Sequence, residues 1–277
     1  MDIGIVGNGV VGSALFEAYK GDNNAMRVYD INPDKTLNSL HDVMEHSELI
    51  FVCLPTPQRK DKLGLDVSVV DGFFARMANQ RERGWDKKNF VLKSTVPIGT
   101  TKEFAKLFNL PNLVHSPEFL TARTSVEDAK SPRINVVGSV GAPMTSERWL
   151  DHPLGRLFMD VYDGREVHFM SSDESEAVKL LMNSFFAVKV AFWNEARSLC
   201  DKLGVSYSTV LNAILQEGRV HPLHTQVPGP DGQFGFGGTC LPKDLSQFSE
   251  QLTSNGLMAD ISCAALLRNV YDRRRVV

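Results

Sequence analysis

The stretch Gly7-Asn-Gly-Val-Val-Gly12 follows directly on the apolar run Ile3–Val6 and leads into the helix-like segment Val11–Tyr19. In a G-x-G-x-x-G turn the first glycine permits a tight bend and the second lets a pyrophosphate approach the backbone. The third lets helix and strand pack closely. The helix N-terminus then offers unpaired N–H groups to the phosphates. This context favours a dinucleotide-binding unit over a glycine turn that binds nothing.

Further apolar, β-branched runs alternate with helical stretches up to about residue 170, as is typical of a parallel sheet covered on both faces. We therefore predict a Rossmann-type, doubly wound α/β domain over residues 1–172. Its expected strands are Ile3–Val6, Arg27–Tyr29, Leu49–Leu54, Phe90–Lys93, Leu113–His115 and Ile134–Val137. Asp30 ends the second strand, where a carboxylate binds the ribose hydroxyls and repels a 2′-phosphate, so the expected cofactor is NAD.

The pattern changes near residue 171, where Ser171-Ser-Asp-Glu174 reads as a capping box. The helix that follows, residues 173–202, is apolar almost all round between Ala177 and Trp193, so we expect it to be buried between domains or subunits. Residues 173–277 are predicted to form an all-α central domain. Its other expected helices are Ser208–Gln216, Lys243–Thr253 and Asp260–Val276, with a long loop over residues 218–239.

Composition narrows the class of protein. The net charge of −3 gives no electrostatic reason to expect a nucleic acid or membrane partner, and no run of about 18 apolar residues predicts a spanning helix. The run Arg273-Arg-Arg275 reads as a solvated helix end. Met1-Asp2 leads straight into a strand, so no signal peptide is expected. The four cysteines show no C-x-x-C pair, so we expect neither a metal site nor a disulfide framework, and a cytoplasmic location.

The segment Gly235-Phe-Gly-Gly-Thr-Cys-Leu-Pro-Lys-Asp244 is the strongest indication of chemistry. Its glycines let the backbone wrap closely around a ligand, and Lys243 would favour the reactive thiolate of Cys240. An arbitrary cysteine is more often a buried, inert thiol, and we assign the other three to packing.

Other polar residues fall at positions suited to a ligand site. Thr95 and Glu118 follow the fourth and fifth predicted strands, at the carboxyl edge where open sheets bind ligands. Lys179 and Asn183 are four residues apart and share one helix face. In so apolar a helix, Lys179 either has a partner, such as Glu176, or extends to water.

Together these motifs resemble the UDP-glucose/GDP-mannose dehydrogenase family over nearly the whole chain. The matching stretches are Gly7–Gly12, Asp30 with Lys35, L-P-T-P at Leu54–Pro57, S-T-V-P-x-G-T at Ser94–Thr100, P-E-F-L at Pro117–Leu120, K-L-x-x-N at Lys179–Asn183 and Gly235–Asp244. The resemblance implies a cofactor site made of Gly7, Asn8, Gly9, Val10, Val11, Gly12, Asp30, Lys35, Thr56 and Thr95.

The resemblance also implies a four-electron oxidation of the C6 alcohol of a nucleotide sugar, most readily UDP-glucose, to the uronic acid. Cys240 would form a thiohemiacetal and then a thioester. The implied catalytic residues are Cys240, Lys179, Asn183, Glu118, Asp244 and Thr95, and the implied substrate-binding residues are Phe119, Leu120, Lys179, Asn183, Arg219, Phe236 and Gly237.

Family members are commonly dimers built on the central helix, so a homodimer through residues 173–202 is expected. The chain ends where the family continues into a further nucleotide-binding domain, which the resemblance therefore implies is missing, and Ala122 stands where the family has an acid that helps to bind the cofactor.

Two other readings remain open. A β-hydroxyacid-type dehydrogenase shares the glycine turn and a K-x-x-x-N helix, but needs no cysteine and reduces one NAD per turnover. A non-catalytic NAD-binding homologue, or one half of a split enzyme, is the other.

Overall fold

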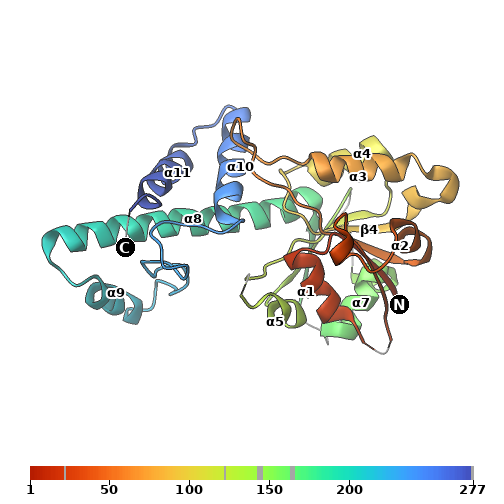
Figure 1. The fold of residues 1–277 in the computed structure, drawn as a ribbon, viewed down its shortest axis with the longest axis horizontal. Helices are drawn as coiled ribbons and strands as arrows, with labels where there is room; N and C mark the ends of the chain where they lie inside the picture. The colour runs from red at the N-terminus through yellow and green to blue at the C-terminus, as the bar shows by residue number, and fades with distance from the viewer. Residues whose placement is uncertain (22, 122, 142–145, 163–165, 276–277) are drawn as a thin grey trace. The chain divides into compact units, whose positions relative to one another are not determined.

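The structure, a computed structural model, describes residues 1–21, 23–121, 123–141, 146–162 and 166–275 (Figure 1). The chain divides into two compact units. The first unit comprises Met1–Thr56 and Asp66–Lys179, and the second comprises Pro57–Leu65 and Leu180–Val277. The segment Pro57–Leu65 thus belongs with the C-terminal part of the chain, although it lies between two strands of the first unit.

The first unit contains one sheet. Among the described residues its strands are β1 (Asp2–Val6), β2 (Ala25–Tyr29), β3 (Leu49–Val52), β4 (Asn89–Leu92), β5 (Leu113–His115), β6 (Asn135–Ser139) and β7 (Val167–Ser171). Their order is β2-β1-β3-β4-β5-β6-β7. The strands β1 to β5 are parallel, as predicted, but β6 pairs with β5 antiparallel and β7 runs parallel to β6. The seventh strand was not predicted, and the direction of β6 differs from the all-parallel sheet expected.

Helices cover both faces of the sheet, as its largely apolar central strands require. These helices are α1 (Val10–Tyr19), α2 (Leu40–His46), α3 (Ser68–Ala78), α4 (Thr100–Phe108), α5 (Ser125–Lys130), α6 (Ser146–Asp151) and α7 (Pro153–Tyr162). In β3, Ile50 and Val52 point into the core beneath α2, α3 and α4. Leu49 and Phe51 point into the core beneath α1 and α7. Alternate residues of one strand thus belong to two separate cores.

Among its described residues, the second unit contains helices and loops and no strand of the sheet. Its helices are the C-terminal part of α8 (Ser172–Leu203), α9 (Tyr207–Gln216), α10 (Leu241–Ser254) and α11 (Asp260–Asp272). The helix α8 begins with the predicted capping box, since Glu174 accepts from the Ser171 N–H at 2.8 Å and donates its own N–H to the Ser171 hydroxyl at 3.3 Å. Ala187 and Ala191 of α8 pack against α10 and α11.

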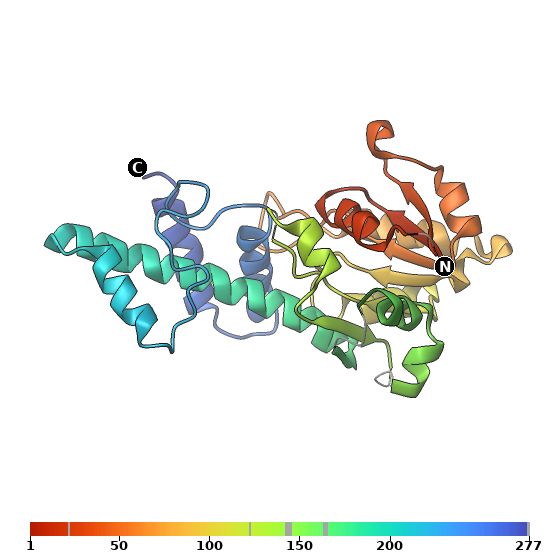
Figure 2. The same cartoon turned by 90° about the horizontal axis from the view of Figure 1, so that it is seen from below.

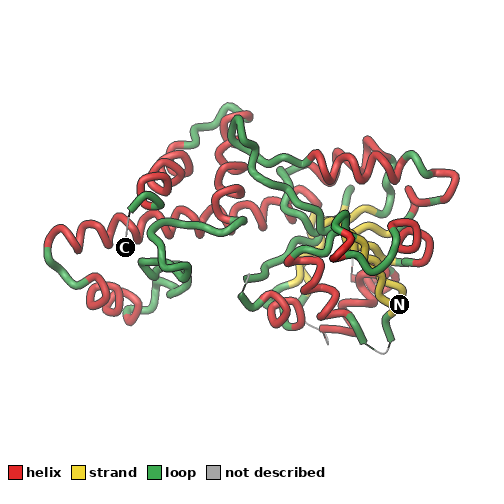
Figure 3. The backbone as a smooth tube through the Cα atoms, in the orientation of Figure 1, coloured by secondary structure: helices red, strands yellow, loops and turns green. Residues whose placement is uncertain are grey.

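At its C-terminal end α8 packs against α9, which runs back beside it, through Trp193 and Tyr207 (Figure 2). The long loop between α9 and α10 contains neither helix nor strand, as predicted (Figure 3). In the part of the chain that the structure describes, no helix is long and apolar enough to cross a bilayer.

One stripe of α8 is exposed in this chain, although the sequence predicts a helix buried all round. Its members are Leu181, Phe185, Phe192, Leu199 and Leu203, which are 46–65% exposed. They recur at intervals of four and seven residues, so they lie along one face of the helix. Within the described residues, the other apolar side chains of α8 are largely covered by the chain itself.

Candidate functional site

The glycine turn after β1 has the geometry that a dinucleotide requires. Gly7 has φ = 96°, and a Cβ there would lie 2.5 Å from the carbonyl oxygen of Cys53. A Cβ on Gly12 would lie 1.9 Å from the carbonyl oxygen of Gly7, so helix and turn are in direct contact. A Cβ on Gly9, the N-cap of α1, would meet nothing within 4 Å. Open space at a helix N-terminus with no side-chain cap leaves the first N–H groups, from Val10 and Val11 on, available to a phosphate.

Asp30 is held at the end of β2 by the glycine turn itself. Its Oδ2 accepts from the N–H of Asn8 at 2.7 Å and its Oδ1 from the N–H of Asn32 at 2.8 Å. The side-chain amide of Asn8 donates to the carbonyl oxygen of Lys35 at 2.7 Å, which brings the Lys35 segment to the same place. Each carboxylate oxygen keeps a lone pair for a ribose hydroxyl, so these residues fit the adenosine half of NAD.

Thr56 and Thr95 meet at the carboxyl ends of β3 and β4. The Thr56 hydroxyl donates to the carbonyl oxygen of Thr95 at 2.7 Å, and Ser94 donates in the same way to the carbonyl oxygen of Leu54 at 2.6 Å. Both threonines are buried. These cross-strand bonds fix the two loops at the ligand-binding edge of the sheet.

Lys179 forms a buried ion pair with Glu118. Its Nζ lies 2.8 Å from Glu118 Oε1, the side chains are 4% and 11% exposed, and the other carboxylate oxygen accepts from the Leu120 N–H at 2.6 Å. Burial raises the pKa of Glu118, but the charge and hydrogen bond of Lys179 outweigh burial and leave the pKa below its ordinary value. The ammonium also lies 5.6 Å from the centre of the Phe119 ring.

Glu176 is not the partner of Lys179, contrary to one reading of the sequence. Its carboxylate instead caps α4, accepting from the N–H groups of Gly99 at 2.6 Å and Thr101 at 2.7 Å. It also accepts from the Thr101 hydroxyl at 2.6 Å. Burial raises the pKa of Glu176 to about 7, against the lowering effect of these hydrogen bonds. Glu176 thus anchors the S-T-V-P loop that carries Thr95.

Lys93 is a buried amine that the sequence reasoning placed in a strand without giving it a role. It follows β4, and its Nζ donates to the carbonyl oxygen of Pro117 at 3.0 Å and approaches the Ser116 hydroxyl at 3.4 Å. Burial lowers its pKa to about 8. A charged residue at the end of an otherwise apolar strand was the available signal. Lys93 supports the loop on which Glu118 lies.

In the second unit, Cys240 is exposed and is the N-cap of α10. Its Sγ lies 3.7 Å from the Thr239 hydroxyl. A helix N-terminus stabilises negative charge placed beside it. Cys240 is therefore an exposed thiol at the N-terminus of a helix.

Lys243 pairs with Asp244 rather than with the thiol. Its Nζ lies 2.6 Å from Asp244 Oδ1, and the side-chain amide of Asn183 donates to Oδ2 at 2.6 Å. Asp244 is fully buried. The expectation that Lys243 acts directly on Cys240 is not supported by this geometry; instead the carboxylate of Asp244 connects α8 with the first turn of α10.

The expected substrate residues are placed unevenly. Phe119 and Leu120 are partly buried beside Glu118. The Phe236 side chain is only 2% exposed and belongs to the apolar cluster with Ala187 and Leu245, so its contribution to a ligand site would come from its backbone. Arg219 is exposed and pairs with Glu217 at 2.5 Å. Ala122 lies outside the described residues.

Two of the C-terminal arginines, Arg273 and Arg275, are bound to the chain rather than solvated, while Arg274 is exposed as expected. Arg273 donates to the carbonyl oxygen of Phe236 at 3.1 Å and to Asp231 at 2.8 Å. Arg275 donates to the hydroxyl of Ser198 at 2.9 Å and lies 3.9 Å from the centre of the Phe234 ring. The sequence reasoning missed these contacts because their partners are distant in the chain.

Comparison with known proteins agrees with this description. Models of the UDP-glucose/GDP-mannose dehydrogenase family match residues 35–149, as the NAD binding domain, and residues 173–271, as the central domain. A UDP-glucose 6-dehydrogenase of Campylobacter jejuni is 28% identical over 89% of this chain and 67% of its own length. One of Rhizobium meliloti is 31% identical over 72% of this chain and 44% of its own length.

A solved UDP-glucose dehydrogenase from Pyrobaculum islandicum superposes with a TM-score of 0.80 at 25% identity. The match covers 98% of this chain and 68% of that structure. The chain thus spans about two thirds or less of the length of these relatives. The two family models, together with the geometry of the glycine turn and Asp30, lead to one conclusion: this chain belongs to the UDP-glucose/GDP-mannose dehydrogenase family, and its cofactor is NAD.

Proposed function

We propose that this protein oxidises the C6 alcohol of a nucleotide sugar, UDP-glucose in the first place, to the uronic acid. The observation that carries the proposal is the exposed thiol of Cys240 at the N-terminus of α10. A one-step alcohol dehydrogenase needs no nucleophile, whereas an oxidation to the acid needs one to hold the carbonyl between its two stages. NAD, which the glycine turn and Asp30 would hold, would supply the hydride acceptor for both stages.

The thiol chemistry balances in four steps. The alcohol first loses two electrons and two protons to become an aldehyde. The Cys240 thiolate then adds to the aldehyde carbon, and the resulting oxyanion takes up a proton to give a thiohemiacetal. Loss of two further electrons and two protons converts this adduct into a thioester. Water finally attacks the thioester carbonyl, and the carbon–sulfur bond breaks to release the acid and the thiolate.

We assign Glu118 the role of general base, which accepts a proton from the water that attacks the thioester. Its depressed pKa keeps it ionised near neutrality, and its ion pair fixes the direction of its carboxylate. Lys179 supplies a buried positive charge that would stabilise an oxyanion, because charge interactions are strong where water is excluded. Thr95 would orient water and substrate at the edge of the sheet.

In the second unit, we assign Asn183 and Asp244 to the steps in which the substrate is bound covalently to Cys240. Asn183 offers its amide for oxyanion stabilisation, and its hydrogen bond to Asp244 sets the orientation of that amide. We assign residues 1–172 to NAD binding and residues 173–277 to a helical central domain carrying the nucleophile. Phe119, Leu120, Arg219 and the backbone at Phe236 and Gly237 are the proposed contacts to the sugar.

We further infer that the protein is a homodimer through α8. The exposed stripe from Leu181 to Leu203 supports this proposal, since its heptad-like spacing suits packing against a second helix of the same kind. Burying a Leu or Phe side chain contributes about 1.5–3 kcal/mol, so two such stripes provide a sizeable driving force.

The proposal is tested by replacing Cys240 with serine. Cys240→Ser should abolish formation of the uronic acid while leaving NAD affinity unchanged, with products followed by mass spectrometry. Cys263→Ser, which alters a partly buried thiol of α11, is the matched control and should retain activity. Acid formation by the Cys240 variant at the wild-type rate would refute the role of the thiol.

A further inference from the structure

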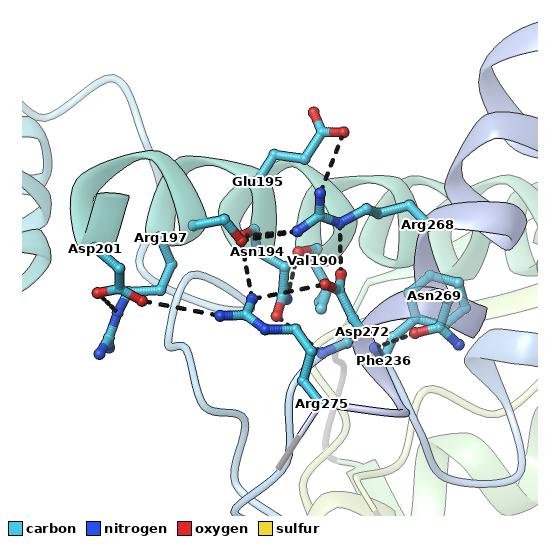
Figure 4. Close-up of polar contacts among 12 residues, drawn as sticks. Val190, Asn194, Glu195, Arg197, Asp201, Phe236, Arg268, Asn269, Asp272 and Arg275 are labelled. Carbon is cyan, nitrogen blue, oxygen red and sulfur yellow. Dashed lines mark hydrogen bonds and ion pairs between the residues drawn. The ribbon is translucent and has the colours of Figure 1, made fainter. Parts of the chain in front are cut away.

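The backbone just before Cys240 is fixed from two helices at once. The side-chain oxygen of Asn194, on α8, accepts from the N–H of Gly235 at 2.9 Å. The side-chain oxygen of Asn269, on α11, accepts from the N–H of Phe236 at 2.7 Å (Figure 4). Arg273, just past the end of α11, donates from Nε to the carbonyl oxygen of Phe236 at 3.1 Å. Both polar groups of the Phe236 backbone are thus bonded to the same turn of chain.

The guanidinium of Arg273 also lies against Gly237. A Cβ built on Gly237 would be 1.4 Å from Arg273 Nη2, so only glycine leaves room for this arginine. The Nη1 atom bonds to Asp231 Oδ2 and to Gln233 Oε1, each at 2.8 Å. Arg273 therefore binds the loop on both sides of Phe236.

The turn that carries Asn269 and Arg273 is itself anchored to α8. Asp272 is fully buried and accepts from Arg268 Nε at 2.8 Å. Arg268 and Arg275 each donate to the Ser198 hydroxyl of α8 at 2.9 Å. Bidentate and multiply bonded guanidinium groups hold a geometry better than a flexible lysine would.

We propose that Asn269 and Arg273 are positioning residues for the nucleophile: by clamping Gly235–Gly237 they set where Cys240 begins α10. Only Gly238 and Thr239 separate Gly237 from Cys240, so a change in the clamped backbone shifts the thiol relative to the N–H groups of the first helical turn. The catalytic part of this inference rests on the proposed function. The clamp itself can be tested without any substrate.

The test measures how fast iodoacetamide alkylates Cys240 at pH 7 in the full-length chain, with the peptide quantified by mass spectrometry. Because the thiol is already exposed, the alkylation rate reports where the thiol lies at the helix N-terminus rather than whether the reagent can reach it. A helix N-terminus contributes about 1 kcal/mol to a nearby negative charge, so Arg273→Ala should slow alkylation about fivefold. Asn269→Leu should slow it in the same direction. Arg274→Ala, which removes an exposed arginine one residue along, is the matched control and should leave the rate unchanged.

Added guanidinium separates positioning from loss of folding. Millimolar guanidinium can occupy the gap left in Arg273→Ala and should restore the alkylation rate. If the variant were slow only because its fold is loosened, guanidinium would act as a denaturant and would not restore the rate. Should Arg273→Ala fail to fold, Arg273→Lys keeps the charge without the planar fork and should show the same slowing. A rate in the Arg273 variants equal to that of Arg274→Ala, or a slowed rate that guanidinium leaves unchanged, would overturn the clamp.

Turnover then places the clamp in the reaction. In an active protein, Arg273→Ala should lower kcat and leave the KM for NAD unchanged. A wild-type chain that oxidises no nucleotide sugar but shows the alkylation effects would refute the proposed function and keep the clamp. If the wild type is active and the Arg273 variants are unaffected, the proposed function stands and the clamp is refuted.

Discussion

The ammonium of Lys179 lies 2.8 Å from Oε1 of Glu118, and water has little access to either side chain. Such a pair costs desolvation energy that its own attraction largely offsets, so its presence is weak evidence for a stabilising role. Removal of one partner is different, because it leaves an uncompensated charge in the interior. This asymmetry makes the pair experimentally accessible.

We predict that Lys179→Met lowers the free energy of unfolding by about 3–5 kcal/mol, because it strands the Glu118 carboxylate. The double variant Lys179→Met/Glu118→Leu should recover most of that loss. Urea denaturation of wild type, both single variants and the double variant forms a complete cycle. If the double variant lost as much unfolding free energy as the two single variants added together, the buried pair would be contradicted. Lys102→Met, which alters an exposed lysine, serves as the control.

Lys93 should make stability depend on pH in the alkaline range. Burial lowers the pKa of Lys93 to about 8 in the folded protein, whereas an unfolded lysine has a pKa of about 10.4. Between these values the unfolded chain binds more protons, so this group's contribution to stability increases as the pH rises and is smallest below pH 8.

The measurement compares the stability of wild type with that of Lys93→Met. Burial raises the pKa of the Cys53 thiol to about 12, so its contribution to stability falls as the pH rises, opposite to that of Lys93. This contribution is present in both proteins, so the difference between them isolates Lys93. The stability difference in favour of wild type should grow between pH 8 and 10 by about 2–3 kcal/mol at most. A difference that stays flat across this window would show that Lys93 keeps an ordinary pKa.

Asp30 should govern the choice between NAD and NADP. Its carboxylate is fixed by the N–H groups of Asn8 and Asn32, so it presents negative charge at the position of the ribose. Asp30→Asn should weaken NAD binding about tenfold and reduce discrimination against NADP. Calorimetric titration of both cofactors checks this, with Asp34→Asn on the exposed turn nearby as the control. Unchanged discrimination would place the ribose elsewhere.

The exposed stripe of α8 should control assembly. Phe192→Glu introduces a charge into the middle of the stripe, where Phe192 is 59% exposed in the single chain. The dimer should weaken about a hundredfold or more, because the charge would have to be desolvated. Analytical ultracentrifugation over a range of concentrations measures this, and Lys202→Glu outside the stripe is the control. A wild-type chain that sediments as a monomer throughout would refute the dimer.

Much of this architecture is encoded in local sequence patterns. The strands β1, β3, β4 and β5 were predictable because they are short runs of mostly apolar, buried residues, and the start of α8 because Ser171 and Glu174 form a capping box. The strand β7 escaped prediction because Val167–Ser171 is only partly buried and mixes polar with apolar residues. The direction of β6 could not be predicted, since apolar periodicity is the same in either orientation.

Side-chain partners were less predictable than elements. Sequence proximity suggested Glu176 for Lys179, whereas tertiary packing pairs it with Glu118. Lys243 pairs with the adjacent Asp244 rather than with the thiol. The contacts of Arg273 with Phe236 and Asp231 cross about 40 residues, and no local pattern reports them. Residues close in the chain compete with distant ones that the fold brings nearer, and the outcome depends on packing.

The central claim is that one thiol carries a sugar carbonyl through two successive oxidations. The most direct measurement is the number of NADH molecules formed for each molecule of UDP-glucose consumed, followed by absorbance together with quantitation of the sugar product. We predict two NADH per sugar and a uronic acid as the product. One NADH per sugar, with the aldehyde or ketone as the end point, would contradict the thioester route.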